Sequence, residues 1–362
     1  MFLEVRTREK GPMSISRENH FLPQMYLKRW SEEGKIKEYK LLVSHENVPI
    51  WTIRPIRKAA VQGNLYVRIE DGVEYDDIEH WFDKHFENPA ARALEKACNG
   101  EKMTSEDWSK LIDFVIAQYV RTPAFHQWTM EMGKTIVPSV LDEVAQKIAS
   151  VTPEEIKSHK NREDDYSSLL PLSIKDTGMH PDEDHTTLEI STMVGKNMWL
   201  MDMKYFLSEK SVVNRYIHSI KWSIVSSPED SEWPTCDSPF IIAQYNAAGN
   251  FQIVKDGIGN NNALVFPLSP NKVLLGTRTR KFDWRFTADD IFFNEIKALI
   301  LNNAYMYVYS REEDDSIPHY RQRVVNEELF KKVMNEYSDW YDKYQEAEAP
   351  YLTQRRTLLK PE

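Results

Sequence analysis

A histidine near the start of the chain is placed where it can do chemistry. His20 lies in the segment NHFLPQMYLKRW, residues 19–30. Pro23 favours an extended conformation in the residue before it and tolerates only the first turn of a helix at its own position. Tyr26 and Trp30 then recur at helical spacing. The segment predicts an extended lead-in to a helix, with the imidazole of His20 free to act as a general acid or base near neutral pH.

The composition is that of a folded protein with a large core. The chain has 362 residues, of which 41% are hydrophobic and 12% aromatic, so bulk disorder is excluded. The length fits about two domains or one large one. The formal net charge of −10 argues against a general nucleic-acid coat protein, whose affinity comes from neutralising phosphates. A small basic pocket remains compatible with this charge.

The cysteines and the apolar runs bear on location. Cys98 and Cys236 are the only two cysteines, so neither a disulfide framework nor a cysteine-based zinc site is expected, and a reducing compartment fits. No apolar run reaches the roughly 18 residues that a transmembrane helix needs. The first 19 residues lack the apolar centre of a signal peptide. We therefore expect a cytoplasmic protein without a membrane or disulfide partner. Its oligomeric state does not follow from these features.

Periodicity and turn residues predict the elements that position such residues. In the first half they predict short strands, then helices, then a long loop or linker, then another helix, over residues 35–43, 49–56 and 65–69 (strands), 75–99, 104–122 and 124–150 (helices), 157–184 (loop) and 185–207 (helix). In the second half they predict five short strands and two helices, over residues 220–226, 240–243, 251–254, 264–266 and 273–277 (strands), and 288–305 and 327–345 (helices).

These elements predict an α+β fold: a predominantly helical body with a smaller antiparallel β-sheet in the C-terminal half. The expected division is a mobile leader, an N-terminal motif with short strands and the helical body, a sheet with flanking helices, and a charged tail, over residues 1–18, 19–210, 211–345 and 346–362. The middle two parts also fit one composite domain. In either case the N-terminal motif is expected to pack between the helices and the sheet.

Several separated pieces together resemble DUF4238, a bacterial family of unknown function. The pieces are the segment 19–30, then QYVRTP at 118–123, then WSIV at 222–225 with TCDSP at 235–239, and finally FPLSP at 266–270 followed by a helix with Asn294 and Asn302. Cys236 departs from the serine expected before the aspartate, which argues against a serine-based role there. The resemblance implies a shared fold from about residue 19 to about residue 310, and no established activity.

The polar residues of these pieces define a candidate site. They are His20, Gln24, Gln118, Arg121 and Asp237. His20 would serve as acid or base, Arg121 would clamp a phosphate or carboxylate, and Asp237 would orient His20 or bind a metal. Gln118 lies three residues before Arg121 and so shares its helix face. Together His20, Arg121 and Asp237 as catalytic residues, with Gln118 and Gln24 binding substrate, fit hydrolysis of a phosphate ester.

Two interpretations of these residues stay open. In the first, the protein is a hydrolase or nuclease acting on a small phosphate-containing ligand or a short RNA, with no metal ligand or cofactor assigned. In the second, it is a non-enzymatic interaction or sensor module, for example a defence-associated one, in which Arg121 and Asp237 form a structural ion pair. The two differ in a checkable way. Catalytic side chains keep spare hydrogen-bonding capacity, whereas structural ones are buried and satisfied.

Overall fold

The larger of two main sheets forms the centre of the protein. The computed structural model describes residues 17–70, 73–150, 172–179, 186–245, 251–254, 257–259, 262–278, 283–336, 342–344 and 346–347. The sheet has six strands in the order β13–β12–β14–β15–β10–β16. Their bounds are β10 Lys221–Ser226, β12 Ile241–Tyr245, β13 Phe251–Ile253, β14 Asn262–Ser269, β15 Lys272–Thr277 and β16 Arg285–Thr287. Every residue of β14 is buried, so this strand is covered on both faces.

Alternation along these strands supplies two hydrophobic cores. Successive side chains of a strand point to opposite faces of the sheet. In β14, Leu264 and Phe266 join the cluster on one face and Val265 joins the cluster on the other. Helix α9 (Asp290–Asn303) covers the second face through Ile296 and Ile300. The first face is covered by helices and by the N-terminal motif.

A second, four-stranded sheet joins residues from both ends of the chain. Its order is β11–β17–β2–β4, and its strands are β2 Lys35–Lys40, β4 Trp51–Pro55, β11 Thr235–Cys236 and β17 Tyr307–Ser310. All three pairings are antiparallel. The 3₁₀ turn η2 (Ile56–Lys58) follows β4 directly.

The remaining described strands form pairs, and the remaining helices surround the sheets. The pairs are β1 Glu18–His20 with β5 Val61–Gly63, β6 Arg68–Glu70 with β7 Val73–Tyr75, β8 Leu172–Met179 with β9 Thr186–Thr192, and β3 Leu42–Val43 with β18 Val324–Val325. The helices are α1 Gln24–Leu27, α2 Asp77–Phe82, α3 Asn88–Asn99, α4 Ser105–Val120, α5 Pro123–Ser150, α7 Lys196–Leu207, α8 Val212–Ser219 and α10 Ile317–Tyr320, together with a helical stretch at 327–336. A 3₁₀ turn, η1 (Lys28–Trp30), follows α1, and a π-helical turn, η3 (Asp83–Glu87), links α2 to α3.

The start of α4 was predictable because it is encoded locally. The backbone N–H of Asp107 donates to the hydroxyl of Thr104 at 3.1 Å, and the N–H of Thr104 donates to the carboxylate of Asp107 at 2.8 Å. This reciprocal capping box satisfies two N–H groups that a helix start otherwise leaves without partners. The helix thus begins where its sequence predicts, and it ends before Pro123, the first residue of α5.

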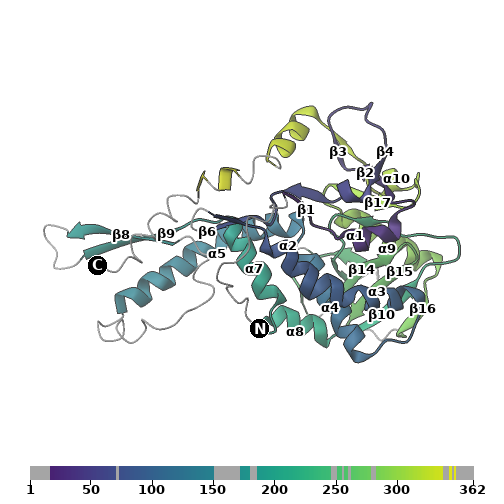
Figure 1. Ribbon diagram of the computed structural model, residues 1–362, viewed down its shortest axis with the longest axis horizontal. Coiled ribbons are helices and arrows are strands. Elements are labelled where there is room, and N and C mark those ends of the chain that lie inside the picture. Colours follow the sequence, from purple (N-terminus) through teal and green to yellow (C-terminus); the bar gives the residue numbers. More distant parts are fainter. Residues whose placement is uncertain are drawn as a thin grey trace.

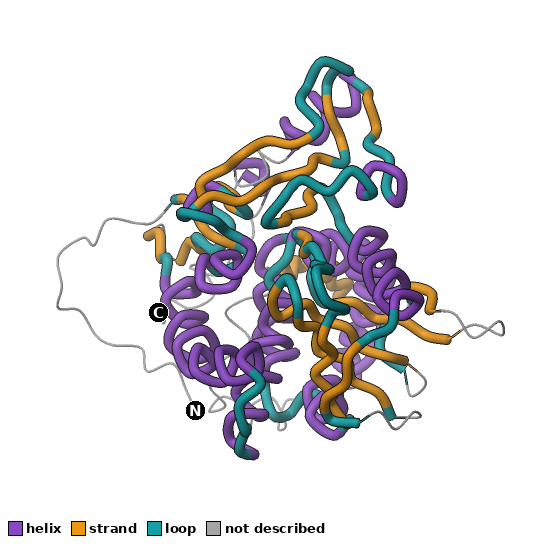
Figure 2. Tube along the Cα trace, turned by 90° about the vertical axis from the view of Figure 1, so that its right-hand side faces the viewer, coloured by secondary structure: helices purple, strands orange, loops and turns teal. Residues whose placement is uncertain are grey.

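The predicted fold class is wrong in its balance and in its sheet. Strand β16 runs parallel to β10, so the large sheet is mixed rather than antiparallel. Strands β2 and β4 come from the N-terminal part, so sheet structure is not confined to the C-terminal half. Figure 2 shows strands in both the upper and the lower part of the molecule. The fold is a mixed α+β arrangement in which helices and sheets are interleaved. Short strands carry no local signal of which distant strand they pair with, and this caused the error.

The segment before α7 also differs from its prediction. Residues 172–179 and 186–192 form the antiparallel hairpin β8–β9 instead of a loop and a helix start. The sequence TTLEIST of β9 is rich in β-branched residues, which favour strands. Figure 1 shows this hairpin beside α5, extending away from the two main sheets. Most of the predicted leader and most of the charged tail lie outside the described residues.

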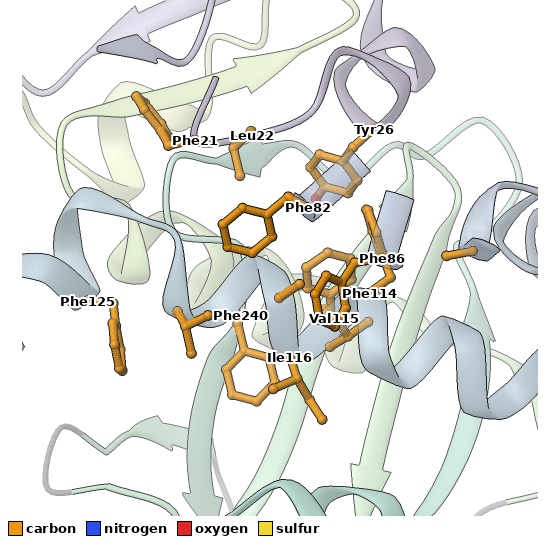
Figure 3. Close-up of a cluster of buried hydrophobic side chains, with 14 of the residues drawn as sticks. Phe21, Leu22, Tyr26, Phe82, Phe86, Phe114, Val115, Ile116, Phe125 and Phe240 are labelled. Carbon is orange, nitrogen blue, oxygen red and sulfur yellow. The ribbon is translucent and has the colours of Figure 1, made fainter. Parts of the chain in front are cut away.

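The N-terminal motif packs where it was expected to pack. Figure 3 shows Phe21, Leu22 and Tyr26 above Phe82 of α2 and Phe114 of α4. All five side chains are buried in one cluster, which also contains residues of the six-stranded sheet. The cluster includes residues on both sides of position 210. The domain boundary drawn there stays a prediction.

Two aromatic side chains of the motif form hydrogen bonds as well as packing in the core. The hydroxyl of Tyr26 lies 2.6 Å from the hydroxyl of Thr235 in β11 and donates to the carbonyl of Pro267 in β14 at 3.0 Å. The indole N–H of Trp30 donates to the carbonyl of Trp233 at 2.9 Å. The motif therefore links β11 of the small sheet to β14 of the large one.

Removing the hydroxyl of Tyr26 tests this link. Tyr26→Phe leaves Thr235 and the Pro267 carbonyl buried without this partner, so we expect a loss of about 1–3 kcal/mol in the free energy of unfolding. Urea denaturation measures it. The matched control is Tyr205→Phe, because Tyr205 is exposed and we expect a change within about 0.5 kcal/mol there. Equal stability of the two variants would contradict the proposed link.

Candidate functional site

The backbone around His20 is held on both sides. His20 is the last residue of β1 and pairs with Val61 of β5. Pro23 has φ −62° and ψ 144° at the N-terminus of α1, so the predicted extended lead-in to a helix is confirmed. The N–H of Phe21 donates to the carbonyl of Ala60 at 3.0 Å, which continues the β1–β5 pairing toward the motif.

Arg121 is a buried cation whose N–H groups point at internal partners. It stands at the C-terminus of α4 with 1% of its surface exposed. Nη1 donates to Glu87 Oε1 at 2.5 Å, Nη2 donates to the carbonyl oxygen of His20 at 2.6 Å, and Nε donates to the hydroxyl of Tyr66 at 3.2 Å. The guanidinium carbon also lies 4.5 Å from the ring centre of Phe82. Three chain segments are therefore bound to one side chain.

Electrostatics agree with this structural role for Arg121. Burial on its own lowers the pKa of a cation, but Tyr66 and the carboxylate of Glu87 outweigh it and raise the pKa of Arg121 above its ordinary value. The guanidinium is therefore charged at every relevant pH. Glu87 ends the π-helical turn η3, which brings its carboxylate to Arg121.

The ring of His20 keeps one nitrogen without a partner. The residue is half-buried, and its Nε2 is shielded from solvent and forms no hydrogen bond with the part of the chain that the structure describes. Burial lowers the pKa of the ring, whereas Glu79 and the backbone of Arg57 raise it. Burial is the larger effect, with Arg121 adding to it, so the pKa of His20 is lowered. The ring is therefore neutral near pH 7.

Glu79 supports the backbone next to this histidine. Its Oε2 accepts a hydrogen bond from the side-chain amide of Asn19 at 2.6 Å. Its Oε1 accepts a longer one, 3.4 Å, from the backbone N–H of His20. Asn19 in turn accepts from the backbone N–H of Tyr66 at 3.2 Å. The carboxylate thus fixes β1 against α2.

The two glutamines differ from each other. Gln118 lies one turn before Arg121 in α4 and is completely buried, yet neither its amide oxygen nor its amide nitrogen has a hydrogen-bond partner among the described residues. A buried amide left unpaired costs roughly 1–3 kcal/mol. Gln24, the first residue of α1, is exposed to solvent.

Asp237 is occupied with a different task. It follows β11 and is 1% exposed. Oδ1 accepts the backbone N–H of Tyr305 at 2.8 Å, and Oδ2 accepts those of Met306 and Tyr307 at 2.6 and 3.0 Å. The carboxylate therefore closes the turn between α9 and β17. Burial raises the pKa of Asp237 to about 7, although the three N–H groups act in the opposite direction.

The structure brings together only part of the set chosen from the sequence. Arg121 meets His20, and Gln118 is one helical turn away. Within the described ranges, Asp237 forms no hydrogen bond or ion pair with Arg121 or His20, and the carboxylate paired with Arg121 is Glu87. The Arg121–Asp237 ion pair of the second interpretation is thus not formed. The roles given to these residues remain predictions.

Sequence reasoning missed Glu79, Glu87 and Tyr66. A buried arginine requires a nearby carboxylate, because an unpaired buried charge is very costly. That requirement says that a partner exists but does not identify it. Glu79 lies in a charged helical run whose pattern is typical of a solvated face.

The described residues provide little for a metal ion. Among them, no three or more His, Cys, Asp or Glu side chains are grouped so as to hold one. His180, Asp182, Asp184 and His185, a further acidic and histidine-rich group of the sequence, lie outside the described residues. The chemistry that the described cluster offers is a neutral imidazole base and a buried amide.

Comparison with known proteins establishes the family. Residues 18–314 match the family described as Protein of unknown function (DUF4238), and the chain belongs to that family. No curated protein and no solved structure matches it. No helix in the described part of the chain is both long enough and apolar enough to cross a membrane. Cys98 and Cys236 are both free thiols, and Cys236 is buried beside Asp237.

The raised pKa of Asp237 predicts how stability depends on pH. The folded protein binds this proton more tightly than the unfolded chain, where the ordinary value is 3.8. Stability from this group is therefore fully present below pH 3.8 and is lost as the pH rises to about 7. The slope approaches about 1.4 kcal/mol per pH unit inside this window.

Denaturation of wild type and Asp237→Asn across this window measures the effect. We expect the stability difference between the two proteins to shrink as the pH rises, because only the wild type has the titrating group. A difference that stays constant across the window would show that the folded-state pKa is not raised.

Proposed function

We propose that the chain is a non-enzymatic interaction or sensor module in which Arg121 and Asp237 hold the fold. The observation that carries this proposal is that both side chains are buried and point their bonding groups at separate internal partners. A substrate clamp needs N–H groups that face the substrate, and those of Arg121 face Glu87, His20 and Tyr66. Both carboxylate oxygens of Asp237 are likewise taken by backbone N–H groups.

Arginine truncation tests the structural role. Arg121→Ala leaves the carboxylate of Glu87 partly buried without its cation, so we expect a loss of about 3–5 kcal/mol and a melting temperature lower by many degrees. Arg311→Ala is the matched control. Arg311 pairs with Glu232 at 2.9 Å on the surface, where loss of an ion pair costs about 0–1 kcal/mol.

The same melting experiment includes a ligand screen of nucleotides, inorganic phosphate and divalent metals. We expect none of them to raise the melting temperature of the wild type. Two results together would contradict the proposal: Arg121→Ala melts at the same temperature as wild type, and a ligand raises the melting temperature of wild type but not of this variant. Arg121 would then be a binding residue.

A second candidate function rests on His20. Its Nε2 and the amide of Gln118 have no hydrogen-bond partner among the described residues, the carbonyl of His20 accepts from Arg121, and Gln118 lies one helical turn before Arg121. A neutral imidazole of this kind is suited to accept a proton from a water molecule or hydroxyl group. This supports the alternative of a hydrolase acting at a phosphate ester, with nucleotides or a short structured RNA as substrates.

Hydrolysis assays on these substrates, with and without divalent metals, separate the two functions. The variants are His20→Ala and, as a control, His80→Ala, because His80 is an exposed histidine on α2. If the module proposal is right, no preparation hydrolyses the substrates above background. The hydrolase function would be established instead if wild type and His80→Ala hydrolyse a substrate and a normally folded His20→Ala does not.

A further inference from the structure

The four-stranded sheet ends in a strand whose outer edge has bonding groups. Strand β4 is the last strand of the order β11–β17–β2–β4, and Figure 1 shows it near the outer end of this sheet. Ile50 and Ile53 are 50% and 62% exposed. An exposed edge strand offers a row of N–H and C=O groups to another strand.

The register identifies which groups point outward. The N–H of Ile56 donates to the carbonyl of Gly34 at 3.0 Å, so position 56 lies opposite position 34 in a hydrogen-bonded pair. Hydrogen-bonded pairs alternate along an antiparallel ladder, so Arg54 and Thr52 also bond to β2. The N–H and C=O groups of Trp51 and Ile53 therefore face away from β2.

The phase of the neighbouring ladder agrees with this assignment. The N–H of Leu41 donates to the carbonyl of Met306 at 2.9 Å. Odd-numbered residues of β2 therefore bond to β17, and even-numbered residues are left for β4. No hydrogen bond within the described structure uses the outward backbone groups of Trp51 or Ile53.

We propose that β4 pairs antiparallel with the β4 strand of a second copy of this chain, about a two-fold axis at Thr52. In this register Trp51 lies opposite the second copy's Ile53, and the reverse, so four N–H···O=C bonds form between the two copies. The same register pairs a tryptophan with a β-branched residue on one face, a favourable cross-strand combination. It also covers the exposed side chain of Ile53.

The ends of the strand limit the pairing to this short ladder. Pro49 and Pro55 carry no N–H group, and the two-fold register places Pro49 opposite the second copy's Pro55. The ladder therefore begins and ends where no donor is present. A two-fold contact uses the same surface on both copies and closes on itself, so it yields a dimer rather than a fibre.

Charge complementarity favours a second copy as the occupant. Glu46 is exposed in the turn before β4, and Arg57 is exposed in η2 just after it. Antiparallel pairing brings the acidic end of each β4 strand beside the basic end of the other, so the two-fold axis generates two such contacts. Arg323 holds the acidic turn in place by donating to the carbonyls of Glu46 and Val48 at 2.9 and 2.8 Å. This inference concerns self-association and goes beyond the proposed function.

The first test of dimerisation is the mass of the protein in solution. We expect wild type to sediment with twice the monomer mass at high micromolar concentration, and Ile53→Lys to sediment as a monomer, because a charge placed on an edge strand opposes pairing. The matched control is Ile291→Lys. Ile291 is 75% exposed on α9, outside the proposed interface, so this variant should remain a dimer. Circular dichroism and melting confirm that each variant is folded.

A cross-link tests the register separately. The two Thr52 residues form a non-hydrogen-bonded pair on the axis, where Cα atoms are about 4.5 Å apart, a separation that a disulfide can span. Thr52→Cys should give a covalent dimer under mild oxidation, and Ile291→Cys should not. Two results would overturn the proposal. In the first, the wild type is a monomer at all concentrations. In the second, the protein is a dimer, but Ile53→Lys remains a dimer and Thr52→Cys does not form a cross-link. In the first case the edge is available to an extended segment of another protein.

Discussion

The fold depends on one buried cation that has to be neutralised. Arg121 stands at the C-terminus of α4, where helix carbonyl groups also lack partners. Its charge is tolerated in the core because Glu87 lies 2.5 Å away and because His20 and Tyr66 accept two more of its N–H groups. The segments that supply these partners are far apart in sequence. Neutralising one charge therefore fixes where the N-terminal motif, the turn after β5 and the α2–α3 region meet.

The aromatic residues of the N-terminal motif extend this arrangement to the sheets. Tyr26 bonds to β11 and β14, and Trp30 bonds to the carbonyl of Trp233, so each side chain combines burial with a hydrogen bond. Large aromatic side chains contribute much apolar area, and their polar atoms need partners once they are buried. The motif thus acts as a joint between helices and sheets, which explains on physical grounds why it is dense in such residues.

The same arrangement separates structural residues from those with unused capacity. Asp237 and Arg121 both bond to internal partners, Asp237 to the N–H groups of a turn and Arg121 to a carboxylate, a carbonyl and a hydroxyl. Among the described residues, the buried polar atoms of the motif pieces without a hydrogen-bond partner are His20 Nε2, Arg29 Nε and the amide of Gln118. Buried polar atoms without partners are uncommon in folded proteins. Of these residues, His20 bonds to Arg121 through its carbonyl oxygen and Gln118 lies one helical turn before Arg121.

The sequence by itself determined the elements that depend on neighbouring residues. The capping box of Thr104 and Asp107, the stop before Pro123 and the extended conformation at Pro23 were all predictable, because each depends on residues a few positions apart. The family followed from short motifs for the same reason. Of the candidate site residues, the structure brings His20 and Arg121 into contact, and Gln118 lies one helical turn from Arg121.

Tertiary structure alone decided which distant groups meet. It pairs Arg121 with Glu87, gives Asp237 to the turn at residues 305–307, joins β2 and β4 to β17, and adds β16 parallel to β10. Any nearby carboxylate can neutralise an arginine, and any strand of suitable length can pair with another strand. The choice is made by how all buried surfaces and charges are satisfied at once, and no local pattern carries that information.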